Sequence, residues 1–396
     1  MKIIDLRART VAIPMTSQLR HNTGVHPGYL MRTILELFTD EGVVGLGEVG
    51  GGDQRAALEK LKPRLIGMDP FQLELIKLKT LRAIYYLANA RIYAAIEMAC
   101  LDIQGKILGR PLSDLLGGRV RDAVPMIGYL FWRYDRPDGK DDTCAEDLAA
   151  HCRELHDTLG VQAMKLKAGV MAPEEEARVL ELVRKDLGDG FGLRIDPNGT
   201  WSVATAVRIG RRLEAIAPEY FEDPAWGLEG NAAVRKQIRI PIATNMYPAR
   251  FDDLGPAIRM EAVDIVLTDI HYWEGPRGVK DLCAVCQTFN LGVAMHSGAE
   301  FGVELAAMIH TASTIPRMTF SGDAHYHHLT DDIIIGGPMR YQDGAIRVPT
   351  GPGLGVQLDE EKMEKYGRYY QEKGDYYARF HQDPRRPEWF PIVGGT

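Results

Sequence analysis

The sequence lacks the features that mark several large classes of protein. Its 396 residues include five scattered cysteines, which exclude a disulfide scaffold. No run approaches the ~18 apolar residues that a membrane-spanning helix needs, and no tract is of low complexity. The formal net charge is −7, so no basic field attracts nucleic acid or anionic lipid. We therefore expect no nucleic-acid partner and no membrane association.

Two further absences concern targeting and zinc. Asp5 stands where a signal peptide would carry its apolar core, so we expect a cytoplasmic protein. Cys283 and Cys286 form a Cys-x-x-Cys, but no second pair completes a zinc site, which favours buried free thiols. No His-x-His ends a predicted strand among the candidate metal ligands, which argues against a hydrolytic zinc barrel.

What is present is the composition of a large globular protein, with 45% apolar and 26% charged residues. The first 120 residues predict an α+β domain. Residues 1–12 alternate as a strand, and 30–49 predict a hairpin whose turn at 39–42 contains Asp and Gly, which tolerate the backbone angles of a turn.

The rest of this first block is helical. From 54 to 115 apolar residues recur at helical spacing, as in Ile92, Ile96, Ala99 and Ile103. Before the hairpin, the polar segment 19–28 carries two histidines, of which one is His26. This segment either reaches a neighbouring site or is a solvated loop.

Beyond residue 120, short β-like runs alternate with helix-length segments. The runs are 124–130, 163–167, 192–196, 220–222, 241–244, 264–268, 292–294 and 318–321. This alternation of about eight βα units predicts an α/β fold, a TIM-type (β/α) barrel whose active site lies at the carboxyl ends of the strands. We place the α+β domain at 1–120 and the barrel at 121–335.

Six predicted strands end on polar residues that recur at the period of the barrel. They are spaced 29, 26, 23, 24 and 27 residues apart, and in chain order they are Lys167, Asp196, Glu222, Asn245, Asp269 and His296. This regular spacing predicts that all six side chains lie together at one end of the barrel. Any one of the three oxygen-bearing residues in the middle, taken alone, could equally be a helix cap or a turn former.

Three of these residues predict a metal site. Asp196, Glu222 and Asn245 offer hard oxygen ligands from adjacent strands and leave positions for water and substrate, which suits Mg²⁺. Turns follow two of the ligands at once, in Asp-Pro-Asn-Gly at 196–199 and Glu-Asp-Pro at 222–224. We expect Mg²⁺ as the cofactor.

Two candidate bases flank the metal site. Lys167 precedes it and His296 follows it, and Asp269 can bind the second ring nitrogen of His296. Lys165 shares one side of its strand with Lys167, and repulsion between the two ammonium groups predicts a lowered lysine pKa. The alternative is an edge strand with two solvated lysines. Opposed bases about a divalent ion imply proton abstraction beside a carboxylate, with the metal stabilising the enediolate.

These motifs resemble the enolase superfamily, whose members use a Lys or His base with Mg²⁺. The resemblance extends from 94–106 and 111–118 in the first domain to the barrel residues. It is strongest to the glucarate dehydratases, in Asn245, in 269–273 and in Gly-Leu-Gly-Val at 353–356. It implies a modified barrel and a C-terminal segment, 336–396, that completes an N-terminal capping domain. Since many barrels of this kind are oligomers, we expect a homo-oligomer.

Carried over by residue, the resemblance implies Lys167 and His296 as catalytic bases and Asp269 as the histidine's partner. Lys165 would tune Lys167 and contact the substrate carboxylate. The implied substrate contacts are Asn198, His26, Tyr129 and His325.

The sequence also departs from the dehydratases. Gly298 and Glu300 stand where they carry Asn and His, so distal polar contacts are missing and Glu300 adds negative charge where the far end of a diacid would lie. The middle metal ligand has an alternative in Glu229, although Glu222 sits at the predicted strand end.

We therefore expect an Mg²⁺-dependent dehydratase acting on a small acid sugar, a carbon–oxygen lyase. It would remove the proton α to a carboxylate and eliminate the β-hydroxyl as water to give a keto-deoxy acid. Opposed bases also permit a racemase or epimerase of a hydroxy acid. The third alternative is a catalytically idle homologue kept for binding.

Overall fold

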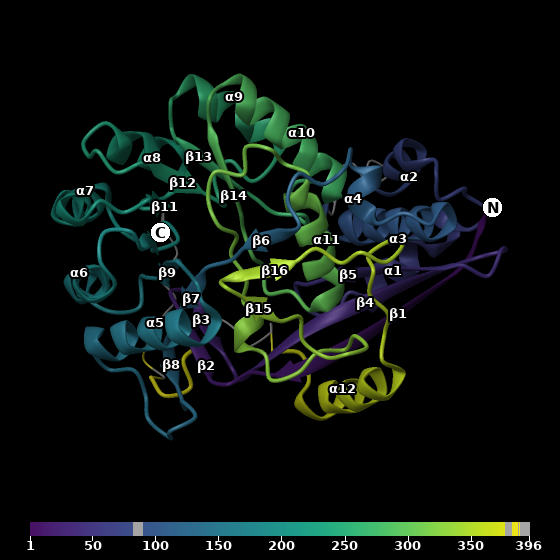
Figure 1. The fold of residues 1–396 in the computed structure, drawn as a ribbon, viewed down its shortest axis with the longest axis horizontal. Coiled ribbons are helices and arrows are strands. Elements are labelled where there is room, and N and C mark those ends of the chain that lie inside the picture. Colours follow the sequence, from purple (N-terminus) through teal and green to yellow (C-terminus); the bar gives the residue numbers. More distant parts are fainter. Residues whose placement is uncertain (82–89, 377–381, 387, 389–396) are drawn as a thin grey trace.

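An antiparallel sheet and a curled parallel sheet form two parts of the molecule (Figure 1). The computed structural model describes residues 1–81, 90–376, 382–386 and 388. The antiparallel sheet has the order β1-β4-β5 and consists of β1 (Ile3–Pro14), β4 (Tyr29–Thr39) and β5 (Val44–Val49). The predicted first strand and hairpin are therefore confirmed.

Two helices, α1 (Arg55–Leu65) and α3 (Ala90–Leu108), contact the strands of this sheet. Two others, α2 (Leu73–Thr80) and α4 (Leu112–Leu115), pack against α3. The predicted apolar face of α3 is buried, and β5 touches the helix directly. A Cβ on Gly45 would lie 2.1 Å from the carbonyl oxygen of Ala99, and one on Gly47 2.1 Å from that of Ala95. The two glycines thus allow backbone-to-helix packing that any side chain would block.

Segment 19–28 is not a plain loop. It contains β2 (Gln18–His21) and β3 (Gly24–His26), which form a hairpin that pairs with β8 (Trp132–Tyr134) in the order β3-β2-β8. The two strands have four and three residues, too few to show a clear alternation, and the pairing partner lies far along the chain.

The parallel sheet carries the barrel. Its order is β14-β13-β12-β11-β10-β9-β7. The strands are β7 (Gly128–Leu130), β9 (Ala163–Lys167), β10 (Gly192–Asp196), β11 (Tyr220–Glu222), β12 (Ile242–Thr244), β13 (Ile265–Thr268) and β14 (Gly292–Met295). Helices alternate with these strands and surround them (Figure 1): α5 (Ala145–Leu159), α6 (Pro173–Leu187), α7 (Val203–Leu213), α8 (Gly227–Arg235), α9 (Phe251–Arg259), α10 (Gly275–Thr288) and α11 (Gly302–Ser313).

The predicted eighth strand, 318–321, is wrong. This segment closes the barrel with single hydrogen bonds, from Thr319 N to Val293 O and from Asp323 N to Met295 O, and with an isolated bridge between Gly322 and Met126. These contacts are too widely spaced for a continuous ladder. The run 124–130 also divides, because β6 (Ala123–Pro125) leaves the barrel.

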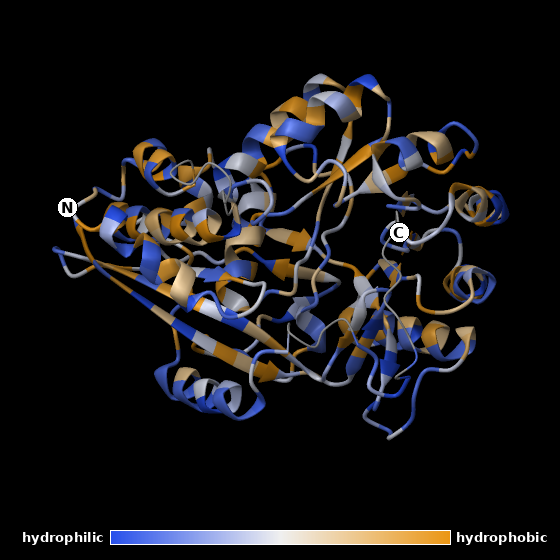
Figure 2. Ribbon diagram, turned by 180° about the vertical axis from the view of Figure 1, so that it is seen from behind, coloured by the Kyte–Doolittle hydropathy of each residue, from blue (hydrophilic) through white to orange (hydrophobic). Residues whose placement is uncertain are grey.

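The chain after the barrel returns to the first domain. β6 pairs with β16 (Ala345–Arg347), which also pairs with β15 (Tyr341–Gln342). The helix α12 (Glu360–Lys373) then packs on β1, where Arg9 Nη1 lies 2.6 Å from Glu360 Oε2. Figure 2 shows α12 as largely hydrophilic, whereas the barrel strands are mostly hydrophobic. Residues 389–396 of the predicted C-terminal segment lie outside the described residues, and the domain boundaries stay a prediction.

The remaining expectations concern thiols and membranes. Cys283 and Cys286 in α10 are free thiols, the first partly buried and the second buried. Among the helices that the structure describes, none combines the length and apolarity needed to cross a bilayer.

Candidate active site

One cavity of about 380 Å³ brings most of the predicted residues together. Its lining includes His26, Tyr129, Lys167, Asn198, Asn245, Asp269, His296 and His325. Segment 19–28 therefore reaches the site. Asp196, Glu222 and Lys165 are not part of the lining, and their side chains are fully buried beside it.

A cluster of buried carboxylates lies next to this cavity. Asp196, Glu222 and Asp223 each offer an oxygen within 4.8 Å of the other two. Burial and the charge of Asp196 raise the pKa of Glu222 well above its ordinary value, and the same two causes raise the pKa of Asp223 to about 7. The cluster thus concentrates negative charge that a bound divalent cation would neutralise.

The amide of Asn245 adds a fourth oxygen. It lies 2.9 Å from Asp223 Oδ2 and 3.2 Å from Glu222 Oε1, while the amide nitrogen lies 2.8 Å from His296 Nε2. Without a cation these oxygens repel one another, and the amide is better satisfied when turned over, with its nitrogen donating to Asp223 and Glu222 and its oxygen accepting from His296 Nε2. A cation among the carboxylates would favour the orientation that points the amide oxygen at it. The set of hard oxygen donors therefore fits Mg²⁺.

Asp223 was not among the predicted ligands. Its neighbour Glu222 ends the strand, and strict alternation would turn the next side chain to the opposite face. Asp223 instead has a left-handed backbone, with φ +37°, that breaks this alternation. The two adjacent acids of Glu-Asp-Pro at 222–224 were the feature of the sequence that could have pointed to Asp223. The alternative ligand Glu229 lies in the first turn of α8 and outside the acidic cluster found among the described residues.

Both lysines are paired with carboxylates. Lys165 Nζ lies 2.8 Å from Glu222 Oε2 and also contacts Asp323, and Lys167 Nζ lies 2.6 Å from Asp196 Oδ2. Burial lowers the pKa of each lysine, but these carboxylates outweigh it and hold both pKa values above the ordinary range. The predicted lowering is wrong because the acidic partners were not foreseen.

The same geometry excludes the edge-strand alternative. β9 lies between β7 and β10 and pairs with both. Lys165 is fully buried, and its ammonium is 4.8 Å from the centre of the Tyr129 ring. Asp323 follows the irregular eighth segment, so no strand pattern in the sequence pointed to it.

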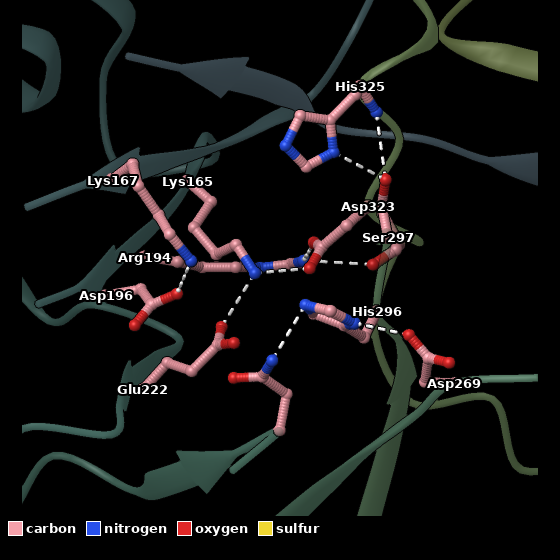
Figure 3. A network of polar contacts seen from close by, with 12 residues as sticks. Lys165, Lys167, Arg194, Asp196, Glu222, Asp269, His296, Ser297, Asp323 and His325 are labelled. Atoms are coloured by element: carbon pink, nitrogen blue, oxygen red, sulfur yellow. Dashed lines mark hydrogen bonds and ion pairs between the residues drawn. The ribbon is translucent and has the colours of Figure 1, made fainter. Parts of the chain in front are cut away.

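His296 is oriented by Asp269. Its Nδ1 lies 2.7 Å from Asp269 Oδ2, while the other carboxylate oxygen accepts hydrogen bonds from the backbone N–H groups of His271 and Tyr272 at 2.7 and 3.0 Å. Burial opposes the charge of Asp269, but the His296 hydrogen bond outweighs it and keeps the pKa of Asp269 below its ordinary value. Nδ1 faces the carboxylate, and Nε2, on the cavity side of the ring, lies 2.8 Å from the side-chain amide of Asn245. Figure 3 shows Lys167 and His296 extending into the site from opposite sides.

The expectation for Glu300 is wrong. Its carboxylate does not line the cavity and is fully buried, where it accepts hydrogen bonds from Ser297 and from the backbone of His325. Gly298 does line the cavity. Arg32 and Arg91, which also line it, were missed because they come from the capping domain and lie outside the barrel repeat.

Comparison with known proteins identifies the architecture. The model of the enolase C-terminal domain-like family matches residues 147–362, and the N-terminal domain of the mandelate racemase / muconate lactonizing enzyme family matches 22–117. The chain belongs to the enolase superfamily. This superfamily protein is 36% identical over 377 residues to a probable glucarate dehydratase from Streptomyces coelicolor, covering 87% of this chain and 86% of that protein.

Two other relatives bear on the chemistry of the family. An enolase from Thermobispora bispora, crystallised with magnesium and formate, has a TM-score of 0.93 at 35% identity and covers 100% of this chain and 99% of its own. An N-succinyl-L-Arg/Lys racemase from Bacillus cereus is 26% identical over 92% of this chain and 98% of its own length. The chain is thus an enolase-superfamily enzyme, while its relatives differ in reaction.

Proposed function

We propose that this enzyme is an Mg²⁺-dependent dehydratase of an acid sugar. The observation that carries the proposal is a base on each side of one oxygen-ligand cluster: Lys167 on β9 and the His296–Asp269 pair. The similarity to a probable glucarate dehydratase and the magnesium and formate in the T. bispora neighbour support the same chemistry. The substrate would be a small acid sugar.

Asp196, Glu222, Asp223 and Asn245 would hold the cation. Bound Mg²⁺ supplies positive charge that stabilises an enediolate. Lys167, once deprotonated, or His296 takes the α-proton, and which one acts depends on the stereochemistry of the substrate. Protonated His296 then gives a proton to the β-hydroxyl, which leaves as water with the electron pair of its C–O bond. The resulting enol becomes the keto-deoxy acid.

The other lining residues would bind and orient the substrate. Tyr129, Asn198, His26 and His325 line the same cavity and offer hydroxyl, amide and imidazole groups. Asn198 is itself held in place, because its backbone N–H donates to Asp196 Oδ1 at 2.8 Å. Lys165, which is not part of the lining, would act through Glu222 rather than by contact with the substrate carboxylate.

The test is a screen of acid sugars with purified protein and Mg²⁺, with 2-keto-3-deoxy products measured by mass spectrometry. We expect one or a few substrates to turn over in wild type, and Lys167→Ala and His296→Asn to lose that turnover. Lys185→Ala, on the exposed face of α6, is the matched control and should keep it. No turnover of any mono- or diacid sugar refutes dehydration, and activity unchanged in Lys167→Ala supports the idle homologue.

Racemisation or epimerisation is the second candidate, because opposed bases can deliver and remove a proton on either face of one carbon. The racemase among the relatives makes this a concrete alternative. Incubation in D₂O separates the two reactions. Deuterium at Cα without loss of water favours racemisation, whereas a keto-deoxy product favours dehydration.

A further inference from the structure

A chain of hydrogen bonds runs from Glu300 through Ser297 to His325. Ser297 Oγ contacts Glu300 Oε2 and lies 2.7 Å from His325 Nδ1. The backbone N–H of His325 donates to both partners, to Ser297 Oγ at 3.0 Å and to Glu300 Oε1 at 3.1 Å. All three side chains are buried, with 1%, 0% and 7% of Ser297, Glu300 and His325 exposed. Figure 3 shows the His325 ring with Nδ1 turned to Ser297 and its other nitrogen turned away.

The direction of these bonds follows from counting hydrogens. An ionised carboxylate only accepts, so the single hydrogen of the Ser297 hydroxyl goes to Glu300. The Ser297 oxygen then has only lone pairs to offer His325, and Nδ1 must carry the ring hydrogen. A neutral imidazole has one such hydrogen, which leaves Nε2 bare.

We propose that Glu300 is a positioning residue that acts through Ser297 to hold His325 in the Nδ1–H tautomer, so that the ring presents a bare Nε2 to the cavity. The ring itself is fixed by aromatic neighbours, with centroids 4.7 Å from Tyr129 and 5.2 Å from Phe131. Rotation of the ring therefore does not substitute for a change of tautomer.

The arrangement reverses when Glu300 binds a proton. Its O–H then donates to Ser297, the Ser297 hydroxyl donates to Nδ1, and the ring hydrogen moves to Nε2 by exchange with solvent. One proton is taken up in all, at Glu300. Burial raises the pKa of Glu300 to about 7, against the hydrogen bond from Ser297, so the reversal falls in the neutral range.

The surrounding charges are compatible with this reversal. The charge of Arg32 lowers the pKa of Glu300, whereas the charge of Glu48 raises it. The side chain of Tyr341 also lies near Glu300. Burial, followed by the charges of His26, Lys167, His296 and His21, holds the pKa of His325 well below its ordinary value. His325 therefore stays neutral while Glu300 titrates, and only its tautomer changes.

The tautomer decides what His325 recognises. A bare Nε2 accepts a hydrogen bond from a substrate hydroxyl, whereas Nε2–H would donate to a carboxylate. Above neutral pH, His325 should therefore bind a hydroxyl group of the acid sugar rather than a carboxylate. This statement about substrate rests on the proposed function, but the tautomer itself does not.

Nuclear magnetic resonance of the full chain, labelled with ¹³C and ¹⁵N in its 11 histidines, reads the tautomer directly. The His325 signals are assigned as those missing from His325→Asn. We expect Nδ1–H in wild type at pH 8.5 and a change toward Nε2–H with a midpoint near the Glu300 pKa of about 7. In Glu300→Gln the amide donates to Ser297, so we expect Nε2–H at every pH.

Two further variants complete the design. Ser297→Ala breaks the chain and should remove the pH dependence of the tautomer. Tyr341→Phe removes a buried hydroxyl near Glu300 and leaves the chain intact, so it should behave as wild type. Nε2–H in wild type at pH 8.5, or the same tautomer at pH 8.5 in wild type and folded Glu300→Gln, overturns the proposal. The wild-type titration decides even if a variant does not fold. A correct tautomer without any acid-sugar turnover refutes only the proposed function.

Discussion

The lysines of β9 act in the described structure as buried counter-charges to the carboxylates around the site. Lys165 pairs with Glu222 and Asp323, and Lys167 pairs with Asp196. A buried charge is tolerated only while its partner is present. The same lysines thus offset part of the negative charge of the carboxylates that can hold a cation and keep their side chains in place.

Replacing Lys165 by Met should destabilise the protein by about 3–5 kcal/mol, because two buried carboxylates lose their counter-charge. Urea unfolding followed by circular dichroism measures the loss. Lys185→Met on the surface is the control and should stay within about 0.5 kcal/mol of wild type. Equal stability of Lys165→Met and wild type would show that the pair contributes nothing.

Replacing Asp269 by Asn should lower kcat about 10²–10⁴-fold with a small change in KM, since His296 loses the charge that fixes its tautomer and stabilises its protonated form. Steady-state kinetics on the substrate found by the screen measure the effect. Asp281→Asn, on the exposed face of α10, should leave kcat unchanged. A loss confined to KM would contradict the assigned role.

At the scale of elements, the barrel closes between β7 and β14 without a regular strand. The strand β7 pairs with β9 on one side, whereas the segment on its other side is irregular. The 3-10 turn η2 (Tyr326–His328) supplies side chains in place of a strand: the Tyr129 N–H donates to His327 Nε2 at 3.2 Å, and His328 Nε2 donates to Tyr129 O at 3.0 Å. Two imidazoles thus complete the backbone hydrogen bonds of Tyr129.

His327→Leu should cost about 1–3 kcal/mol of stability, because the Tyr129 N–H loses its acceptor. His327→Gln keeps an acceptor and should lose less. Chemical unfolding compares the two, and hydrogen exchange at the Tyr129 amide should rise in the leucine variant alone. Identical losses in both variants would show that packing, not the hydrogen bond, is responsible.

At the scale of the whole molecule, the capping domain is joined to the barrel by a buried polar contact. Glu48 on β5 accepts hydrogen bonds from the backbone N–H groups of Phe301 and Glu304 at the start of α11, at 2.7 and 2.9 Å. Arg32 lies 2.8 Å from the same carboxylate and also lines the cavity. Because a helix N-terminus favours negative charge, this contact fixes the capping domain on the barrel beside the cavity.

Mg²⁺ should raise the stability of the entire protein. A cation bound only by the folded state adds about 2.7 kcal/mol at 100 times its Kd, so Tm should rise on adding Mg²⁺ and fall with a chelator. Glu222→Gln should lose most of this rise, whereas Glu229→Gln should keep it. The opposite result would move the ligand to Glu229.

The sequence by itself determined which polar residues follow the barrel strands and how regularly they are spaced. A strand and a helix recur at nearly constant length, so residues at the strand ends, from Lys167 to His296, had to meet at one mouth. The segments with such regular patterns, such as β9 and β10, were predicted to the residue. These outcomes depend on local periodicity, which one stretch of chain carries alone.

Only the tertiary structure decided what depends on contacts between distant segments. Asp323 reaches Lys165 because the segment that follows α11 runs irregularly in place of an eighth strand. Asp223 joins the acidic cluster through one backbone angle, and Glu300 turns away from the cavity toward Ser297. Pairing of buried charges is set by which side chains meet after folding, and no spacing in the sequence encodes it.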